Sequence, residues 1–379
     1  MTSFNADTHS TATATATAVA ADANAATVNT AATAAKNLTD RRGRHLRDLR
    51  VSVTDRCNFR CEYCMPRDVF GRDHRFLPKH RLLRFEEIET VVRAFAGLGV
   101  RKVRLTGGEP LLRHDLEELV SKLARIDALD DLALTTNASL LTAARARALR
   151  RAGIRRVNIS LDALDETIYR RINRIDSPLD GILRGIDYAL DAGFESVKIN
   201  MVVQKGVNVS EIIPLAGRFR GSGAILRFIE FMDTGNHNQW SLQQVFTARE
   251  IIDLLGAVWE LQPVGANYPG EVAKRWRYAD GAGEIGVIAS ISRPFCGGCA
   301  RARLSAVGEI YTCLFASAGF DLRPALKAGA DEAELAARIA AIWRQRGDQY
   351  SVDRLTPGRP GAPRGMRTSQ KVEMSYIGG

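Results

Sequence analysis

A regular alternation of strand-like and helix-like segments, from about residue 41 to about residue 245, constrains the fold more than any other feature. Several of the helix-like segments stop at a glycine, as at Gly99, Gly153 and Gly193. This spacing is typical of right-handed βαβ crossovers, which build a parallel sheet. The sequence contains six such repeats, fewer than the eight of a closed (β/α)8 barrel. We therefore expect an α/β fold, an incomplete (β/α)6 TIM-like barrel.

The expected strands carry polar residues near their carboxyl ends, where barrel-like folds place their chemistry. These polar residues are Thr54, Thr106, Thr135, Ser160 and Glu230. We expect the strands at 49–53, 103–106, 132–135, 157–160, 197–203 and 225–231. We expect helices between them at 85–98, 115–126, 142–152, 179–192 and 209–220.

The alternation fades after residue 245, and the composition changes at both ends of the chain. Residues 270–292 are expected to form short antiparallel strands, and residues 331–346 one more helix. Residues 11–35 are almost all Ala and Thr, which bury too little surface to offset their chain entropy. We therefore expect a disordered Ala/Thr-rich extension at 1–40, the partial barrel at 41–245, and a C-terminal extension with its own cysteine group at 246–379.

The chain is basic, with 53 Lys and Arg against 43 Asp and Glu, a net charge of +10. Because residues 1–40 carry three Asp and one Lys, the rest of the chain carries +12. This excess suggests an anionic partner, but it does not choose between a nucleotide, a nucleic acid and simple solubility. No apolar run of about 18 residues predicts a membrane span, and no secretory signal is visible. We expect a cytoplasmic protein that does not bind a membrane, in which clustered cysteines are metal ligands.

The first cysteine group is Cys57, Cys61 and Cys64, with C-x3-C-x2-C spacing. A structural zinc site would need a fourth ligand, for which His45, His74 or His80 are candidates. A [4Fe–4S] cluster also takes four ligands, so three cysteines would leave one iron open to a substrate or cofactor. The spacing alone leaves both alternatives open.

This cysteine motif after the first strand, together with Gly107-Gly108-Glu109-Pro110 after the second, resembles the radical S-adenosylmethionine enzymes. The resemblance implies that Cys57, Cys61 and Cys64 hold a catalytic [4Fe–4S] cluster whose open iron binds S-adenosylmethionine. It also implies that Gly108 and Glu109 line the methionine amine, where a glycine permits close approach and a carboxylate can accept from an ammonium.

Three further positions match cofactor contacts of the family. Tyr63 resembles the aromatic residue beside the adenine, and Ser160 the residue at the methionine or ribose part of the cofactor. Met232 resembles a residue whose backbone reaches the adenine. The resemblance therefore implies a cofactor site that extends from the first cysteine loop to the end of the sixth strand.

The second cysteine group is Cys296, Cys299 and Cys313, and the chain has no further cysteine. The nearest histidine, His237, lies well outside this motif. The economical interpretation is a second [4Fe–4S] cluster with an open iron, while a zinc site would need a distant residue as its fourth ligand.

The two groups together resemble the radical S-adenosylmethionine enzymes that cyclise GTP at the first step of molybdenum-cofactor biosynthesis. The resemblance runs from about Arg44 to the end of the chain. It rests on Arg50–Cys57, Arg104–Pro110, Arg227–Met232, Gly270–Lys274, Cys296–Leu304 and the terminal Gly378-Gly379. It implies that the second cluster and a set of basic and polar residues bind GTP: Arg50, Arg104, Thr135, Lys198, Arg301, Ala302 and Arg303. It also implies that Gly378 and Gly379 enter the active site and are needed for catalysis.

The same resemblance implies an electron donor, a homodimer, and a functional partner that makes cyclic pyranopterin monophosphate from the product. Two alternatives remain open. One is a radical enzyme that modifies a peptide and carries an auxiliary cluster. The other, from a different class, is a zinc-stabilised nucleic-acid-binding protein, which the βα alternation and the lack of a dense basic stripe disfavour.

Overall fold

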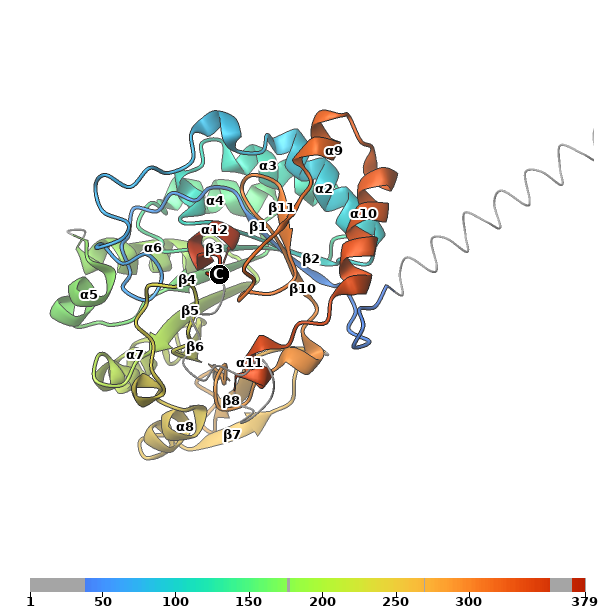
Figure 1. The fold of residues 1–379 in the computed structure, drawn as a ribbon. Coiled ribbons are helices and arrows are strands. Elements are labelled where there is room, and N and C mark those ends of the chain that lie inside the picture. Colours follow the sequence, from blue (N-terminus) through green and yellow to red (C-terminus); the bar gives the residue numbers. More distant parts are fainter. Residues whose placement is uncertain (1–37, 176–177, 269, 355–369, 379) are drawn as a thin grey trace, which may run out of the picture.

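The computed structural model describes residues 38–175, 178–268, 270–354 and 370–378. The six predicted strands are present and pair in parallel, in chain order, because each is joined to the next by a crossover through a helix (Figure 1). They are β1 (Asp48–Ser52), β2 (Lys102–Thr106), β3 (Asp131–Thr136), β4 (Arg156–Ser160), β5 (Ser196–Val203) and β6 (Ile225–Glu230).

The C-terminal region adds strands to both edges of this sheet. Strand β10 (Arg301–Leu304) pairs in parallel with β1, and β9 (Glu284–Ile288) pairs in parallel with β6. The predicted antiparallel strands in 270–292 are β8 and β9, but the parallel pairing of β9 with β6 was not predicted. The outer strands are β7 (Leu261–Val264), β8 (Lys274–Tyr278), β11 (Glu309–Tyr311) and β12 (Phe320–Asp321).

The sheet stays open, with the order β12-β11-β10-β1-β2-β3-β4-β5-β6-β9-β8-β7. Strands β7 and β12 are its ends and do not pair with each other, so the fold is an incomplete barrel, as predicted. The C-terminal region therefore extends the same sheet.

The helices that join the strands cover the outer face of the sheet (Figure 1), whereas the short helices at 350–353 and 374–377 contribute residues to the opposite face. Those predicted are α2 (Phe85–Gly97), α3 (Leu116–Ala124), α4 (Ala143–Ala152), α6 (Leu179–Asp191), α7 (Ile212–Phe219) and α10 (Glu332–Gln345). Those not predicted are α5 (Glu166–Asn173), α8 (Ala248–Gly256), α9 (Arg323–Lys327), α11 (Tyr350–Asp353) and α12 (Met374–Ile377). Short 3-10 turns are η1 (Lys79–Arg81), η2 (Pro110–Leu112), η3 (Val209–Glu211), η4 (Leu242–Gln244) and η5 (Cys296–Gly298).

The alternation of side chains along each strand separates an apolar face from a polar one. On β1 and β2, Leu49, Val51, Val103 and Leu105 are fully buried beneath the helices. The residues between them, such as Arg50, point to the opposite, concave face, because successive side chains of a strand point to opposite sides. The core thus lies between sheet and helices, and the concave face is left for polar side chains.

Residues 38–40 belong to the folded part of the chain, although the disordered extension was predicted to reach residue 40. Leu38 and Asp40 are 4% and 6% exposed, and Thr39 forms a β-bridge with His45. Residues 1–37, on which the rest of that prediction falls, lie outside the described residues. Within the described ranges, no helix is both long and apolar enough to cross a membrane.

Candidate active site

The concave face of the sheet encloses a cavity of about 790 Å3. Both cysteine groups line it, with one group following β1 and the other flanking β10. All predicted cofactor residues also line it, as do all predicted GTP residues except Ala302. The architecture therefore brings together residues that are separated by more than 200 positions in the chain.

Two sulfur atoms of the first cysteine loop form hydrogen bonds that hold the loop, one as acceptor and one as donor. The backbone N–H of Phe59 donates to Cys57 Sγ over 3.4 Å, and Cys61 Sγ donates to Asn173 Oδ1 over 3.1 Å. Burial raises the pKa of Cys57 to about 12 and the pKa of Cys61 well above its usual value. Buried thiols of this kind become thiolates only when a cation replaces the proton, as metal binding does.

The two glycines after β2 allow this turn to lie directly against the backbone that leads into the cysteine loop. A Cβ at Gly107 would lie 2.4 Å from the carbonyl oxygen of Thr54, and one at Gly108 would lie 2.3 Å from that of Arg56. The N–H groups of Gly108 and Glu109 donate to these same carbonyls over 2.8 Å. The glycine pair therefore fixes the start of the first cysteine loop.

Glu109 is 1% exposed at the cavity wall and joins the ends of β2 and β3. Its carboxylate accepts from the Thr136 hydroxyl and from the Asn137 N–H, each over 2.7 Å. Burial raises the pKa of Glu109. Its carboxylate is thus held by the chain itself at the edge where the first cysteine group lies.

The remaining cofactor candidates lie around the first cysteine loop. The Tyr63 hydroxyl donates to Asp162 Oδ2 over 2.9 Å, which fixes the ring at the cavity wall. Ser160 ends β4, and Met232 follows β6 with its carbonyl accepting from Asn238 Nδ2 over 2.9 Å. The loop after β1 and the carboxyl ends of β4 and β6 thus bring these three residues to the wall of one cavity.

The second cysteine group surrounds the N-terminal end of β10. Cys296 lies in η5, Cys299 lies two residues before β10, and Cys313 follows β11. Arg301 Nη2 donates to Cys299 Sγ over 3.2 Å. Burial opposes the thiolate of Cys299, but the charges of Arg301 and Arg346 outweigh burial and lower its pKa to about 6. Burial raises the pKa of Cys313 to about 11.

Three predicted GTP residues form what we call the basic layer: Arg50, Arg104 and Arg303. Arg50 lies in register with Arg104 on one side and with Arg303 on the other. Burial and the neighbouring positive charges lower the pKa of Arg50 well below its usual value, and burial with the charge of Arg301 lowers the pKa of Arg303 to about 10. In the described part of the chain, the Nε atoms of all three are buried without a hydrogen-bond partner. Three neighbouring arginines with unpaired donors can bind a polyanion, which would both accept their hydrogen bonds and neutralise their charges.

The other predicted GTP residues extend the basic layer. Lys198 lies beside Asn158 on the neighbouring strand, and burial with the charge of Arg227 lowers the pKa of Lys198 to about 7. The buried hydroxyl of Thr135 has no hydrogen-bond partner among the described residues. Ala302 is fully buried and does not line the cavity, so only its backbone can serve a ligand.

Several cavity residues were not predicted as site residues. Burial and the charge of Arg104 lower the pKa of Arg227 to about 9 and the pKa of Lys102 to about 8. Arg227 donates to Asn200 Oδ1 over 2.9 Å and to Asn158 Oδ1 over 2.5 Å. The alternation of polar and apolar residues along the strands could have indicated both, because Arg227 lies in the predicted strand 225–231 and Lys102 directly precedes the predicted strand 103–106.

The C-terminal tail enters this region. Helix α12 packs against β1, Ile377 is fully buried, and the Tyr376 hydroxyl donates to Glu309 Oε2 over 3.0 Å. Gly378 has φ +73°, and a Cβ there would lie 2.3 Å from Cγ2 of the cavity residue Thr106. Gly379, also predicted as a site residue, lies outside the described residues.

The cysteine groups suit a cluster better than a single ion. Among the described residues, no three Cys, His, Asp or Glu side chains converge as one metal ion requires. In a [4Fe–4S] cluster each thiolate binds a different iron, so the sulfur atoms need not converge on one point. The three half-buried thiols of the first group line one wall of the cavity, and Cys57 Sγ accepts from a backbone N–H, so the group fits such a cluster.

Comparison with family models agrees with the fold and the site. Residues 51–218 match the Radical SAM superfamily, and residues 224–352 match Molybdenum Cofactor Synthesis C. Fold and site thus define a radical S-adenosylmethionine enzyme that holds this cofactor and an iron–sulfur cluster.

Sequence relatives narrow the family further. GTP 3′,8-cyclase of Acidothermus cellulolyticus is 51% identical over 363 residues, which cover 90% of this chain and 99% of the relative. The enzyme of the same name from Xanthomonas axonopodis pv. citri is 51% identical over 342 residues, with 90% and 99% covered. The Staphylococcus aureus enzyme is 45% identical over 345 residues, with 91% and 99% covered. The chain belongs to the GTP 3′,8-cyclase family.

A solved structure supports the fold alone. Streptococcus suis SuiB bound to S-adenosylmethionine aligns with a TM-score of 0.56 at 14% identity, over 78% of this chain and 68% of that one. This similarity confirms the partial-barrel architecture that the sequence predicts.

Proposed function

We propose that the chain converts GTP to (8S)-3′,8-cyclo-7,8-dihydroguanosine 5′-triphosphate, the first step of molybdenum-cofactor biosynthesis. Membership of the GTP 3′,8-cyclase family supports the reaction. The observation that carries it is the basic layer: its three arginines line a cavity shared with both cysteine groups, and their buried Nε atoms have no hydrogen-bond partner among the described residues. Cys57, Cys61 and Cys64 would hold an iron–sulfur cluster, which would supply the electron for cleavage of S-adenosylmethionine and so the radical chemistry that joins the 3′ carbon of GTP to C8.

The chain's own residues orient the two reactants. The triphosphate of GTP binds to Arg50, Arg104 and Arg303, with Lys198, Thr135 and Arg301 at its sides and the Ala302 backbone behind. Arginine suits this role because its planar donors bind phosphate oxygens in pairs. Holding the sugar against the cofactor makes the reaction effectively unimolecular, and the enclosed cavity keeps competing hydrogen donors away.

The cofactor side of the cavity is formed by Gly108, Glu109, Tyr63, Ser160 and Met232. Glu109 accepts from the methionine ammonium, which a buried carboxylate does strongly. Tyr63 packs by the adenine. The ring of Tyr63 is fixed by Asp162, so the adenine meets a surface that is already ordered.

The second cysteine group holds a second [4Fe–4S] cluster, through Cys296, Cys299 and Cys313. Because the group has three cysteines, one coordination position of such a cluster would be left for the guanine of GTP. Replacing Cys313 with Ser tests this assignment by the affinity for GTP, which should fall. Unchanged affinity would contradict it.

The remaining partners follow from the reaction. The chain needs an electron donor, acts as a homodimer in the cytoplasm, and passes its product to cyclic pyranopterin monophosphate synthase. It uses neither a membrane nor a nucleic acid.

Anaerobic incubation of the iron-loaded protein with GTP, S-adenosylmethionine and dithionite tests the proposal. We expect 5′-deoxyadenosine and the cyclised nucleotide in equal amounts, and about eight irons per chain. A colourless zinc protein, or 5′-deoxyadenosine formation that requires a peptide in place of GTP, would overturn it.

A further inference from the structure

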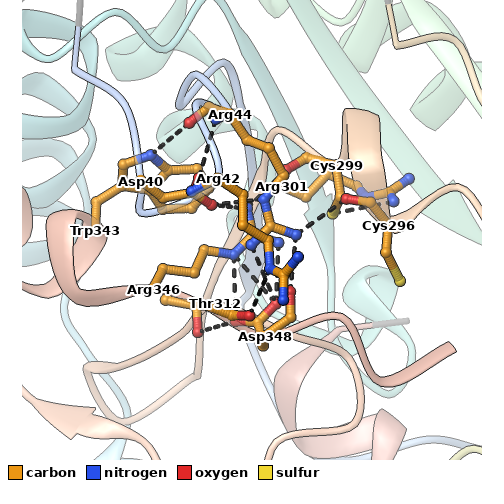
Figure 2. Close-up of polar contacts among 11 residues, drawn as sticks. Asp40, Arg42, Arg44, Cys296, Cys299, Arg301, Thr312, Trp343, Arg346 and Asp348 are labelled. Carbon is orange, nitrogen blue, oxygen red and sulfur yellow. Dashed lines mark hydrogen bonds and ion pairs between the residues drawn. The ribbon is translucent and has the colours of Figure 1, made fainter. Parts of the chain in front are cut away.

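A largely buried network of charged residues, in which Asp348 alone is partly exposed, contacts the segments of the second cysteine group (Figure 2). It consists of Asp40, Arg44, Arg346 and Asp348, and we call it the clamp. Arg44 Nε donates to Asp40 Oδ2 over 2.6 Å, and Arg346 Nη1 lies 3.4 Å from the same oxygen. The side chains of Asp40, Arg44 and Arg346 are 0%, 2% and 1% exposed. The clamp therefore joins the start of the folded chain to the segment after α10.

The clamp reaches all three segments that carry the second cysteine group. Arg44 Nη1 donates to the carbonyl of Cys296 over 3.0 Å, and Arg346 Nη1 donates to the carbonyl of Cys299 over 2.6 Å. The hydroxyl of Thr312, the residue before Cys313, donates to Asp348 Oδ2 over 2.8 Å. Each cysteine is thus positioned through its own backbone or through its neighbour's side chain.

The two arginines are themselves held in place. Arg346 Nε lies 3.2 Å from both oxygens of Asp348, and Arg44 Nη1 also donates to the Asp348 carbonyl over 2.8 Å. The indole of Trp343 donates to the Arg44 carbonyl over 3.0 Å, and the guanidinium of Arg346 lies 4.5 Å from its ring centroid. Planar guanidinium groups fixed on several sides hold their acceptors at defined positions.

Stability alone is a weak explanation for such a network. Two buried arginines are costly to desolvate, and apolar side chains of similar volume often stabilise a protein equally well. An ordering role accounts for the cost better, because each arginine also donates from Nη1 to the carbonyl of a cysteine in the second group. The first cysteine group has no contact of this kind with the clamp among the described residues.

We propose that Asp40, Arg44, Arg346 and Asp348 are positioning residues for the second cysteine group, and that the N-terminal arm 38–47 must dock before that group can hold its cluster. The inference rests on the proposed function, because it takes the second group to be a cluster site. The clamp would orient the segments that supply the ligands, as residues that are hydrogen-bonded to metal ligands do in other metal sites.

Arg346→Met tests the inference, since methionine keeps much of the volume and removes every donor. Iron and acid-labile sulfide should fall from about eight to about four per chain. Reductive cleavage of S-adenosylmethionine without GTP, which depends on the first group, should persist. The change that GTP produces in the electron paramagnetic resonance spectrum of the reduced protein should disappear. Arg346→Lys, which keeps one donor and the charge, should recover part of the iron.

Arg42→Met is the matched control, because the exposed side chain of Arg42 donates to the carbonyl of Gly347 over 2.8 Å, in the same segment, and the substitution keeps the backbone N–H that donates to Asp40. It should keep about eight irons. Arg346→Met with about eight irons and an unchanged response to GTP would overturn the inference, as would equal loss of iron from both groups. If circular dichroism shows that Arg346→Met is unfolded, the same measurements on Asp40→Asn test the inference instead. Failure of the unaltered protein to cyclise GTP would count against the proposed function. The iron contents of the variants would still test whether the clamp positions the second cysteine group.

Discussion

Arg50 and Arg104 lie directly opposite each other on neighbouring parallel strands, each with a buried Nε atom that has no partner in the described part of the chain. The positive charges of two arginines in register on adjacent strands repel each other, and the repulsion is strong where water is excluded. The free protein therefore carries a cost that a bound polyanion would remove. Affinity for GTP and stability of the free protein should then respond in opposite directions when one of these arginines is lost.

Replacing Arg104 with Met should weaken GTP binding about 10- to 100-fold, which corresponds to roughly 1.5–3 kcal/mol for a hydrogen bond to a charged group. The same change should raise the melting temperature of the free protein, because one desolvated and repelled charge is removed. Anaerobic titration with GTP and thermal melts measure the two effects. Exposed Arg147 offers the control, since Arg147→Met should alter neither. A lower melting temperature for Arg104→Met would contradict the argument.

GTP binding should take up protons near neutral pH because burial, with the charge of Arg227, lowers the pKa of Lys198 to about 7. Free Lys198 is then partly neutral above pH 7, while a bound phosphate favours its protonated form. Affinity should fall as the pH rises above 7, by up to tenfold per pH unit for one such group. Calorimetry in two buffers of different ionisation enthalpy measures the uptake.

Lys198→Met provides the control for this pH dependence, because the variant lacks the titrating amine. The slope should become shallower, and the remainder should come from Lys102, whose pKa is lowered to about 8. The sign for stability is the reverse of that for affinity. Between the lowered folded pKa and the usual value of 10.5, the unfolded chain binds more protons, so the free protein gains stability as the pH rises through this window.

A methyl group at Gly108 should damage the first cysteine group selectively. The added Cβ would lie 2.3 Å from the carbonyl oxygen of Arg56, the residue before Cys57, so the loop must move. Gly108→Ala should lose about four of eight irons and at least tenfold of the cleavage of S-adenosylmethionine, a cost of about 1.4 kcal/mol or more. Gly97→Ala is the control because nothing lies within 4 Å of its added methyl. Full cleavage activity in Gly108→Ala would refute the prediction.

The sequence predicts the parallel core well, and the physical reason is local. The six strands and most long helices follow from apolar periodicity and from stop signals such as Gly153, which ends α4 with φ +127°. Helix α5 escaped prediction because its sequence, ETIYRRIN, is mostly polar and its start depends on Asp165, whose side chain accepts from Thr167 and Ile168. Local signals of this kind are easily overlooked in a short segment.

Long-range pairing could not be predicted from the same signals. Strand β10 lies beside β1 although about 250 residues separate them in sequence, and no local pattern specifies a parallel partner at that distance. The clamp is similar, because Asp40 and Arg346 are recognisable as a pair only after α10 has brought them together. The cysteine and Gly-Gly-Glu-Pro motifs, by contrast, are short and contiguous, so the candidate site was visible before the fold.

The C-terminal tail should act at the cavity, because Gly378 combines a left-handed conformation with a close approach to Thr106. Deleting Gly378 and Gly379 should abolish cyclisation while about eight irons remain. Gly378→Ala should lower turnover at least tenfold, or about 1.4 kcal/mol, because its methyl would lie 2.3 Å from Thr106 Cγ2. Gly193→Ala separates strain from crowding: Gly193 has φ +74° but nothing within 4 Å of an added Cβ. This control should cost about 1 kcal/mol of stability and leave turnover unchanged. If Gly378→Ala and the control both keep normal turnover in assays of product formation, the tail does not act at the cavity.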